Sequence, residues 1–506
     1  MSHIHVPPAI SDATGAGARK LYHAGTLTYT KAALGVLFFW LLWGDFCYML
    51  MEAVTPSIMP LKFKALEAPN IVVGLVLTTI PMSMSWVLNP VISFWSDRCR
   101  SRWGRRLPFI LLSIPFLVVS LIGLAFGEQV APHLRPILGS LVAGWSPNTL
   151  AIVIIGILMV IFSFFNTFVN AVYWYLFNDV VPVHLLARFM SFFRLVSLGT
   201  GAMYSYFIFP HANTHATLIF VGAGLIYFFG FGLMCLNIKE GTYPPPPENT
   251  DGRTGVVSAV KTYGMECMCH RLYWYQFVGV LFGACGGSIG VFGLYGALAL
   301  GLDLQQIGTL AAVGSIVTAI LIPVSGWLAD RYHPLRVVLA GQTIGFVLSP
   351  LGLIWLFWFP STNVIFWYCL ITGVLLSAPV NALNGVGDPP LLMRMFPRSR
   401  YGQFCSANNL WRSTGTALGA VLAGAFLDFV TRHHTSINPY FFSPFWSMFF
   451  GAPSLICTYN MYRTWKELGG DESYVPPLPE GAHDHHTVSV EAAPGAGSGA
   501  LVDPST

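Results

Sequence analysis

Two carboxylates interrupt an otherwise apolar stretch near the start of the chain. Asp45 and Glu52 are seven residues apart, which in an α-helix is about 20° short of two full turns, so both would lie on one face, about 10 Å apart along the axis. A carboxylate in a low-dielectric cavity favours its protonated form. We therefore predict that Asp45, together with Glu52, binds and releases a proton. Glu52 lies further toward the end of the stretch, so a solvated or gating role stays open for it.

Other polar side chains in apolar stretches could bind a solute. Asn170 and Trp174 have the i, i+4 spacing that places two side chains on one helix face. Together an amide and an indole suit the hydroxyl edges and the C–H face of a sugar ring. Arg194, Asn381 and Arg412 add polar groups to other apolar stretches. We predict that these residues bind substrate; the alternatives are helix packing, an interfacial tryptophan and static ion pairing.

Two polar junctions between apolar stretches carry a carboxylate beside arginines. The residues concerned are Asp97, Arg98, Arg105 and Arg106 at the first junction and Asp330 and Arg331 at the second. Ion pairs and helix-end dipoles at such junctions can hold two parts of a helical bundle together. We predict a gating role for these residues. The alternative is that the arginines only keep the first loop on one side of a membrane.

The composition indicates which elements position these groups. The chain has 506 residues, of which 54% are apolar and 9% charged, and its net charge is +4. Soluble domains have roughly 25% charged residues, so a soluble enzyme is excluded, as are a disordered scaffold and a nucleic-acid binder. A membrane-spanning helix needs about 20 apolar residues, and we expect an all-α polytopic membrane protein. Twelve such stretches occur, at roughly 32–59, 70–95, 107–127, 149–180, 188–209, 216–237, 273–299, 305–328, 336–359, 364–388, 404–430 and 438–462.

The distribution of positive charge predicts the orientation. With the N-terminus in the cytoplasm, four of the 26 Lys and Arg residues fall in outer loops and two within spans, so the other 20 lie on the cytoplasmic side, as the positive-inside rule requires. We expect both termini in the cytoplasm, in a bacterial inner membrane or a plasma membrane, without a cleaved signal peptide. The nine cysteines are not expected to form a structural disulfide. We expect no metal site and no cofactor.

Internal similarity indicates two repeats. The triplet around Asn170 matches the triplet around Asn381, and the segments that start at Arg194 and Arg412 both end in Gly-Ala eight residues later. Carriers with such repeats place substrate between them and rock one repeat against the other. The domains expected are a cytoplasmic N-terminal tail at 1–30, a six-helix bundle at 31–237, a central cytoplasmic loop at 238–272, a second six-helix bundle at 273–465 and a disordered cytoplasmic tail at 466–506.

The first polar junction carries the most specific motif of the chain. It reads Ser96-Asp97-Arg98-Cys99-Arg100-Ser101-Arg102-Trp103-Gly104-Arg105-Arg106, and the first span contains Trp43-Gly44-Asp45-Phe46. On these residues, the chain resembles the major facilitator superfamily over about residues 30–465. Within it, the chain is similar to the glycoside–pentoside–hexuronide:cation symporters and to the sucrose:proton symporters. The resemblance implies twelve transmembrane helices in two pseudo-symmetric six-helix bundles.

The resemblance also implies roles for single residues. Asp45 matches an aspartate that contacts the sugar, and Trp174 matches a tryptophan that stacks on it. Arg194 matches an arginine that lines the site, and Arg412 stands in the position of a lysine. Asn170, by contrast, replaces a sugar-binding acid of the family.

Sodium coupling is disfavoured by a second departure from the family. Ser85 and Asn89 stand where the family has the two acids that bind sodium, and neither side chain supplies the negative charge of such a site. We therefore expect a secondary active transporter that carries a sugar or glycoside with a proton by alternating access.

Several alternatives to this function stay open. One is a carrier of another polar solute, such as a nucleoside or a sugar acid, and another is an uncoupled facilitator. A membrane enzyme is disfavoured because no Ser/His/Asp set or phosphate-binding loop is found, and a sensor because the tail contains no output domain. The expected partners are a small-molecule substrate, a proton and the lipid bilayer, and we expect a monomer.

Overall fold

The structure of the protein is a computed structural model. It describes residues 21–142, 144–241, 267–397, 400–433 and 437–477. Most of the expected terminal tails and most of the central loop lie outside the described residues. A hairpin of two short strands, β1 (Tyr22–Ala24) and β2 (Leu27–Tyr29), falls within the expected N-terminal tail and was not predicted.

The first half of the structure runs from residue 31 to residue 237. Its segments match the first six predicted spans, and three of these spans contain a π-helical turn. Both π-helical and 3₁₀ turns carry the label η. They are α1 (Lys31–Ala65); α2 (Asn70–Gly74), η1 (Leu75–Thr79) and α3 (Ile80–Arg98); α4 (Leu107–Leu138) with η2 (Gly139–Val142); α5 (Pro147–Val180); α6 (Val183–Met203), η3 (Tyr204–Ile208) and η4 (Phe209–His211); and α7 (Ala212–Ile226), η5 (Tyr227–Phe231) and α8 (Gly232–Asn237).

The second half runs from residue 271 to residue 467 and matches the other six predicted spans. Its segments are α10 (Arg271–Gly287), η6 (Ser288–Phe292) and α11 (Gly293–Ala299); α12 (Leu304–Tyr332); α13 (Pro334–Leu348) and η7 (Ser349–Leu356); α14 (Thr362–Thr372), η8 (Gly373–Ser377) and α15 (Ala378–Met395); α16 (Tyr401–His433); and η10 (Pro439–Phe442) and α17 (Ser443–Glu467). A short helix, α18 (Gly470–Ser473), follows.

The helices are long and apolar enough for a membrane protein. In the described part of the chain, ten helical runs meet the length and hydropathy expected of a membrane span, and one of them, Arg188–Asn237, covers two predicted spans. The all-α polytopic fold class predicted from the sequence is therefore confirmed.

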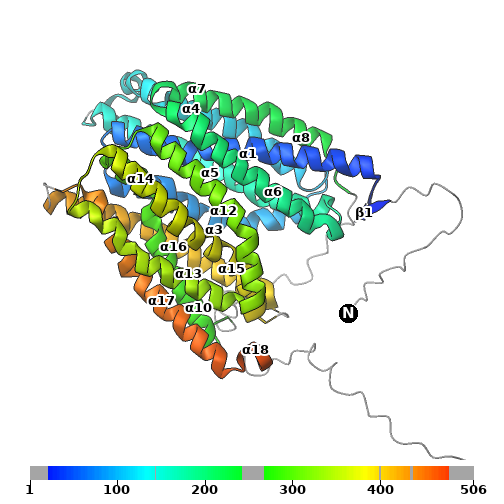
Figure 1. The fold of residues 1–506 in the computed structure, drawn as a ribbon. Coiled ribbons are helices and arrows are strands. Elements are labelled where there is room, and N and C mark those ends of the chain that lie inside the picture. Colours follow the sequence, from blue (N-terminus) through cyan, green and yellow to red (C-terminus); the bar gives the residue numbers. More distant parts are fainter. Residues whose placement is uncertain (1–20, 143, 242–266, 398–399, 434–436, 478–506) are drawn as a thin grey trace, which may run out of the picture.

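The two halves pack against each other mainly at two places. α16 lies against α2 and α3, and α12 lies against α6. Figure 1 shows the blue-to-green first half above the green-to-red second half. Glycine makes both contacts possible. A Cβ on Gly74 would lie 2.3 Å from the carbonyl oxygen of Ala420, and a Cβ on Gly308 would lie 2.1 Å from that of Ser205. A larger residue at either position would force the halves apart.

Candidate substrate and proton site

Asp45 lies at the centre of the first half. Its side chain on α1 is fully buried, and its Oδ2 accepts a hydrogen bond of 2.9 Å from the Ser197 hydroxyl on α6. Its other carboxylate oxygen, Oδ1, is buried without a hydrogen-bond partner. A buried charged oxygen without a donor is costly, and a proton on Oδ1 would remove the charge.

Glu52 lies on the same side of α1 as Asp45, close enough for their charges to interact. Its neighbours are the Tyr48 hydroxyl and the Asn166 amide, and Tyr48 itself donates a hydrogen bond of 3.3 Å to Asn166 Oδ1 on α5. The Tyr227 hydroxyl, also in the first half, is buried without a hydrogen-bond partner. Both predicted proton-binding acids thus lie inside the first half, Asp45 beside Ser197 and Glu52 beside Tyr48 and Asn166.

The aromatic and basic residues of the predicted sugar site are connected to Asp45 through α6. Trp174 on α5 is 43% exposed, and its ring meets that of Phe193 on α6 edge to face at 5.3 Å. Arg194 follows Phe193 and is exposed, as is Asn170 one turn before Trp174. The Ser197 hydroxyl also lies 3.0 Å from the Phe193 carbonyl oxygen, so its one proton is shared between that oxygen and Asp45 Oδ2. One turn of α6 therefore presents Arg194 outward and contacts Asp45 inward.

Arg412 is paired within the second half. Its Nη2 donates a hydrogen bond of 2.6 Å to Oδ2 of Asp388 on α15. The sequence analysis missed Asp388 because it ends a predicted span and precedes Pro389 and Pro390, which usually mark a helix end. α15 instead continues to Met395, which places Asp388 about two turns inside the helix. Asp388 could have been found from the sequence as an acidic residue within a predicted span in the same half as Arg412.

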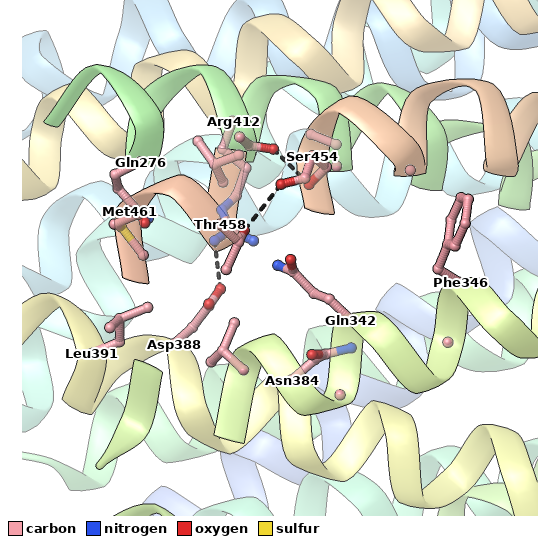
Figure 2. A pocket seen from close by; sticks show the side chains of 18 of the residues that line it. Gln276, Gln342, Phe346, Asn384, Asp388, Leu391, Arg412, Ser454, Thr458 and Met461 are labelled. Atoms are coloured by element: carbon pink, nitrogen blue, oxygen red, sulfur yellow. Dashed lines mark hydrogen bonds and ion pairs between the residues drawn. The ribbon is translucent and has the colours of Figure 1, made fainter. Parts of the chain in front are cut away.

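A cavity of about 350 Å³ lies inside the second half (Figure 2). Arg412, Asp388 and Asn384 line it, whereas Asp45, Trp174 and Arg194 are not among its lining residues. Asn381, one turn before Asn384 on α15, is exposed and does not line it either. The predicted binding residues therefore fall into two groups, one in each half, and this cavity does not join them.

Arg105 and Arg106 of the first junction are bound within the first half. Both guanidinium groups contact Asp179 at the end of α5, at 2.5 Å from Arg105 and 3.1 Å from Arg106. Asp97 and Arg98 end α3, but their side chains lie outside the described residues. The ion pairs of Asp179 with these arginines were not predicted, although Asp179 lies near the end of a predicted span.

Glu240 contacts the backbone of the same junction. Its carboxylate accepts hydrogen bonds from the backbone N–H groups of Arg105, Arg106 and Leu107, at 2.8, 2.9 and 2.7 Å. Burial raises the pKa of the Glu240 carboxyl, and these three donors partly oppose the shift. A Cβ on Gly104, whose φ is +109°, would lie 2.5 Å from the Glu240 carboxyl carbon. The loop is thus shaped around Glu240.

The second junction is more open. Asp330 lies 3.7 Å from Arg394 on α15, and the Asp330 side chain is 80% exposed. The Arg331 guanidinium lies over the rings of Trp327 and Tyr332. These contacts join elements of the second half.

Asp428 forms a contact between the halves that the sequence analysis missed. Its Oδ1 accepts from the backbone N–H and the side-chain amide of Asn70, at 3.0 and 2.8 Å, and its Oδ2 accepts from the Ile71 N–H at 3.0 Å. The Tyr440 hydroxyl donates to Asn70 Oδ1 at 2.8 Å. Nearby, the Tyr295 hydroxyl donates to the Pro60 carbonyl at 2.7 Å. An acid inside the span 404–430 was the signal that could have found it.

Comparisons with known proteins agree with this architecture. The sequence model of the Major Facilitator Superfamily matches residues 41–420. A membrane-associated transporter protein from Homo sapiens is 38% identical over 76 residues, and the sucrose transport protein SUT5 from Oryza sativa subsp. indica is 35% identical over 49 residues. These matches cover 15% and 10% of this chain and only 13% and 9% of the relatives' lengths.

Solved structures match over a much larger share of the chain. A bacterial homologue of the human lysosomal transporter Spinster, inward-facing and occupied, has a TM-score of 0.59 at 14% identity and covers 87% of this chain and 99% of its own. The nucleoside transporter NupG has a TM-score of 0.57 at 11% identity (85% and 99% covered). A D-xylose-proton symporter has a TM-score of 0.53 at 15% identity (84% and 95% covered). At these identities the likeness shows the fold.

Proposed function

Because the chain belongs to the Major Facilitator Superfamily, whose members are membrane transporters, we propose that it is a secondary active transporter that carries a neutral sugar or glycoside together with a proton. One observation carries this proposal. The Ser197 hydroxyl on α6 donates to the buried Asp45 carboxylate at 2.9 Å, one helical turn after Phe193 and Arg194. A change in the charge of Asp45 therefore acts directly on α6, the helix that presents Arg194 and whose Phe193 ring contacts Trp174 on α5.

Sugar recognition is supported by the surface around Trp174. Its exposed ring offers an apolar face, and Asn170 one turn earlier offers both a donor and acceptors; the C–H face and hydroxyl edges of a sugar need such groups. The names of two similar proteins, a sucrose transport protein and a D-xylose-proton symporter, fit the same class. Asn381 faces outward from α15 and would contribute from the second half.

A neutral solute is favoured over a sugar acid by the charge of the second half. Two arginines could clamp a carboxylate, but Asp388 already neutralises Arg412 at 2.6 Å. Arg194 then has no second positive partner for an anion. A nucleoside is the second candidate, because the exposed Trp174 face would stack on a base as well as on a sugar ring.

Alternating access is supported by where the halves meet. With the termini in the cytoplasm, Asp428, Asn70, Tyr295 and Tyr440 lie at the outer end of the bundle, so their hydrogen bonds would close the outer side. Asn170, Trp174 and Arg194 are exposed closer to the cytoplasmic ends of their helices. We propose that the chain is inward-facing here, in a bacterial inner or plasma membrane, and acts as a monomer. The two junctions, with Asp97, Arg98 and Arg105 at the first and Asp330 at the second, would form the inner gate when that side closes.

Uptake into proteoliposomes tests the proposal. Labelled sucrose, maltose and uridine would be offered with an imposed inward proton gradient and, separately, without one. We expect accumulation of a sugar above its outside concentration only with the gradient, and none of uridine. Accumulation of uridine alone would replace the sugar proposal by the nucleoside one. Equal sugar uptake with and without the gradient would show an uncoupled facilitator.

A further inference from the structure

The cavity inside the second half is separate from the solute site proposed above. Its wall comes from α10, α13, α15, α16 and α17, and its volume is about 350 Å³. Cavities that bind small molecules begin at roughly 300 Å³. The space is therefore large enough for a small organic ligand.

Two amide oxygens on the wall of this cavity lack a hydrogen-bond partner. They are Oε1 of Gln342 on α13 and Oδ1 of Asn384 on α15, and both atoms are buried. Figure 2 shows the Gln342 side chain extending into the space toward Arg412, with Asn384 beside it. A buried carbonyl oxygen without a donor is costly, so a ligand with hydrogen-bond donors would be stabilised here.

The hydroxyl groups on the opposite wall of the cavity can only accept. The Ser454 hydroxyl donates to the Gly279 carbonyl at 2.9 Å, and the Thr458 hydroxyl donates to the Ser454 carbonyl at 3.1 Å. Both protons are therefore used within the protein, and the remaining lone pairs are left for the cavity. Acceptors on two walls favour a ligand that carries several donors.

The charge of the cavity restricts the ligand further. Its two ionised groups, Asp388 and Arg412, neutralise each other at 2.6 Å. A cation placed here would lose its hydration without meeting an uncompensated carboxylate, and an anion would meet no uncompensated guanidinium. Both side chains of the pair are partly exposed, so the pair forms the accessible rim.

We propose that this cavity is a second binding site, for a small neutral polyhydroxy compound of the size of a monosaccharide. Hydroxyl groups of the ligand donate to Gln342 and Asn384, and Arg412 donates to a ligand oxygen. Small residues leave the room: a Cβ on Gly341 would lie 2.6 Å from Asn384 Oδ1. Because all of the lining residues belong to the second half, a ligand in this site does not occupy the path between the halves.

Equilibrium dialysis of the purified full-length protein with labelled D-glucose tests the site. The background variant is W174A, which weakens the proposed transport site and leaves the cavity intact. In this background we expect binding of D-glucose to persist, and the double variant Q342L/N384L to weaken it at least tenfold, about the effect of losing two hydrogen bonds. Q305L, the same exchange at an exposed position in the same half, serves as the control and leaves binding unchanged.

Three results would overturn the proposal. The first is D-glucose binding that W174A abolishes, the second is binding that Q342L/N384L leaves unchanged, and the third is no D-glucose binding at all. Sodium-dependent thermal stabilisation that Q342L/N384L removes would contradict the neutral ligand as well. If the double variant does not fold, Q342M keeps the side-chain length and removes one of the two acceptors, and a loss of affinity of about threefold, the effect of one hydrogen bond, is expected. Binding is measured without transport, so failure of the transport proposal leaves this test unaffected.

Discussion

Asp428 on α16 accepts three hydrogen bonds from the first turn of α2, two of them from Asn70 and one from the neighbouring backbone N–H. A carboxylate of the second half thus caps the positive end of a helix in the first half. Hydrogen bonds to a charged acceptor are stronger than neutral ones, and a helix start favours a negative charge. In the proposed alternating-access cycle, outward opening would break this contact.

We predict that D428N loosens the outer side. The amide protons of Asn70 and Ile71 should exchange with deuterated water at least about fivefold faster in the variant, since losing a charged acceptor costs about 1–3 kcal/mol. Hydrogen–deuterium exchange of peptides that cover residues 66–74 measures this. Asp303 caps α12 within the second half, so D303N is the matched control and should leave these peptides unchanged. Equal exchange in D428N and wild type would remove Asp428 from the gate.

The fold class could be predicted from the sequence because the length and hydropathy of an apolar run indicate whether it can span a membrane as a helix. Hydropathy did not single out Asp388 and Asp428, because each lies at or near the end of a predicted span, where polar residues are common. Only the actual helix lengths place these acids inside the bundle. Which carboxylate pairs with which arginine depends on the packing of helices that are far apart in the sequence. Residue spacing along the chain does not determine this pairing.

The Arg412–Asp388 pair leads to a prediction about stability. R412Q and D388N each leave one charge without its partner, whereas R412Q/D388N leaves none. Because both side chains are partly exposed, we expect each single variant to lose about 1 kcal/mol and the double variant to recover most of it. Thermal unfolding in detergent, analysed as a double-mutant cycle, measures the coupling. Additive losses would mean that the two residues do not interact.

His333 between α12 and α13 predicts a pH dependence. Its Nδ1 accepts from the Leu335 N–H at 3.3 Å, and its ring stacks on Trp465 at 4.5 Å. Burial, with Arg394 and Arg336 nearby, lowers the pKa of His333 to about 4. Between about pH 4 and pH 6.5, the unfolded chain, in which histidine has a pKa of about 6.5, therefore binds more protons than the folded chain. Stability from this residue is present above about pH 6.5 and falls as the pH drops toward 4.

H333N isolates this effect. Asparagine accepts the same hydrogen bond, tolerates the φ of 70° at this position and does not titrate. We expect the melting temperature of the wild type to fall more than that of H333N between pH 7 and pH 5. Parallel curves for the two proteins would show that His333 is not held neutral in the folded state.

The most direct test of proton-coupled transport is the D45N variant in proteoliposomes. The amide keeps the shape and the hydrogen bond to Ser197 but cannot exchange a proton. We predict that D45N still exchanges labelled sugar across the membrane without a gradient, and that it no longer accumulates sugar when an inward proton gradient is imposed. Wild-type accumulation by D45N would contradict the account and move proton coupling to Glu52 or to another group.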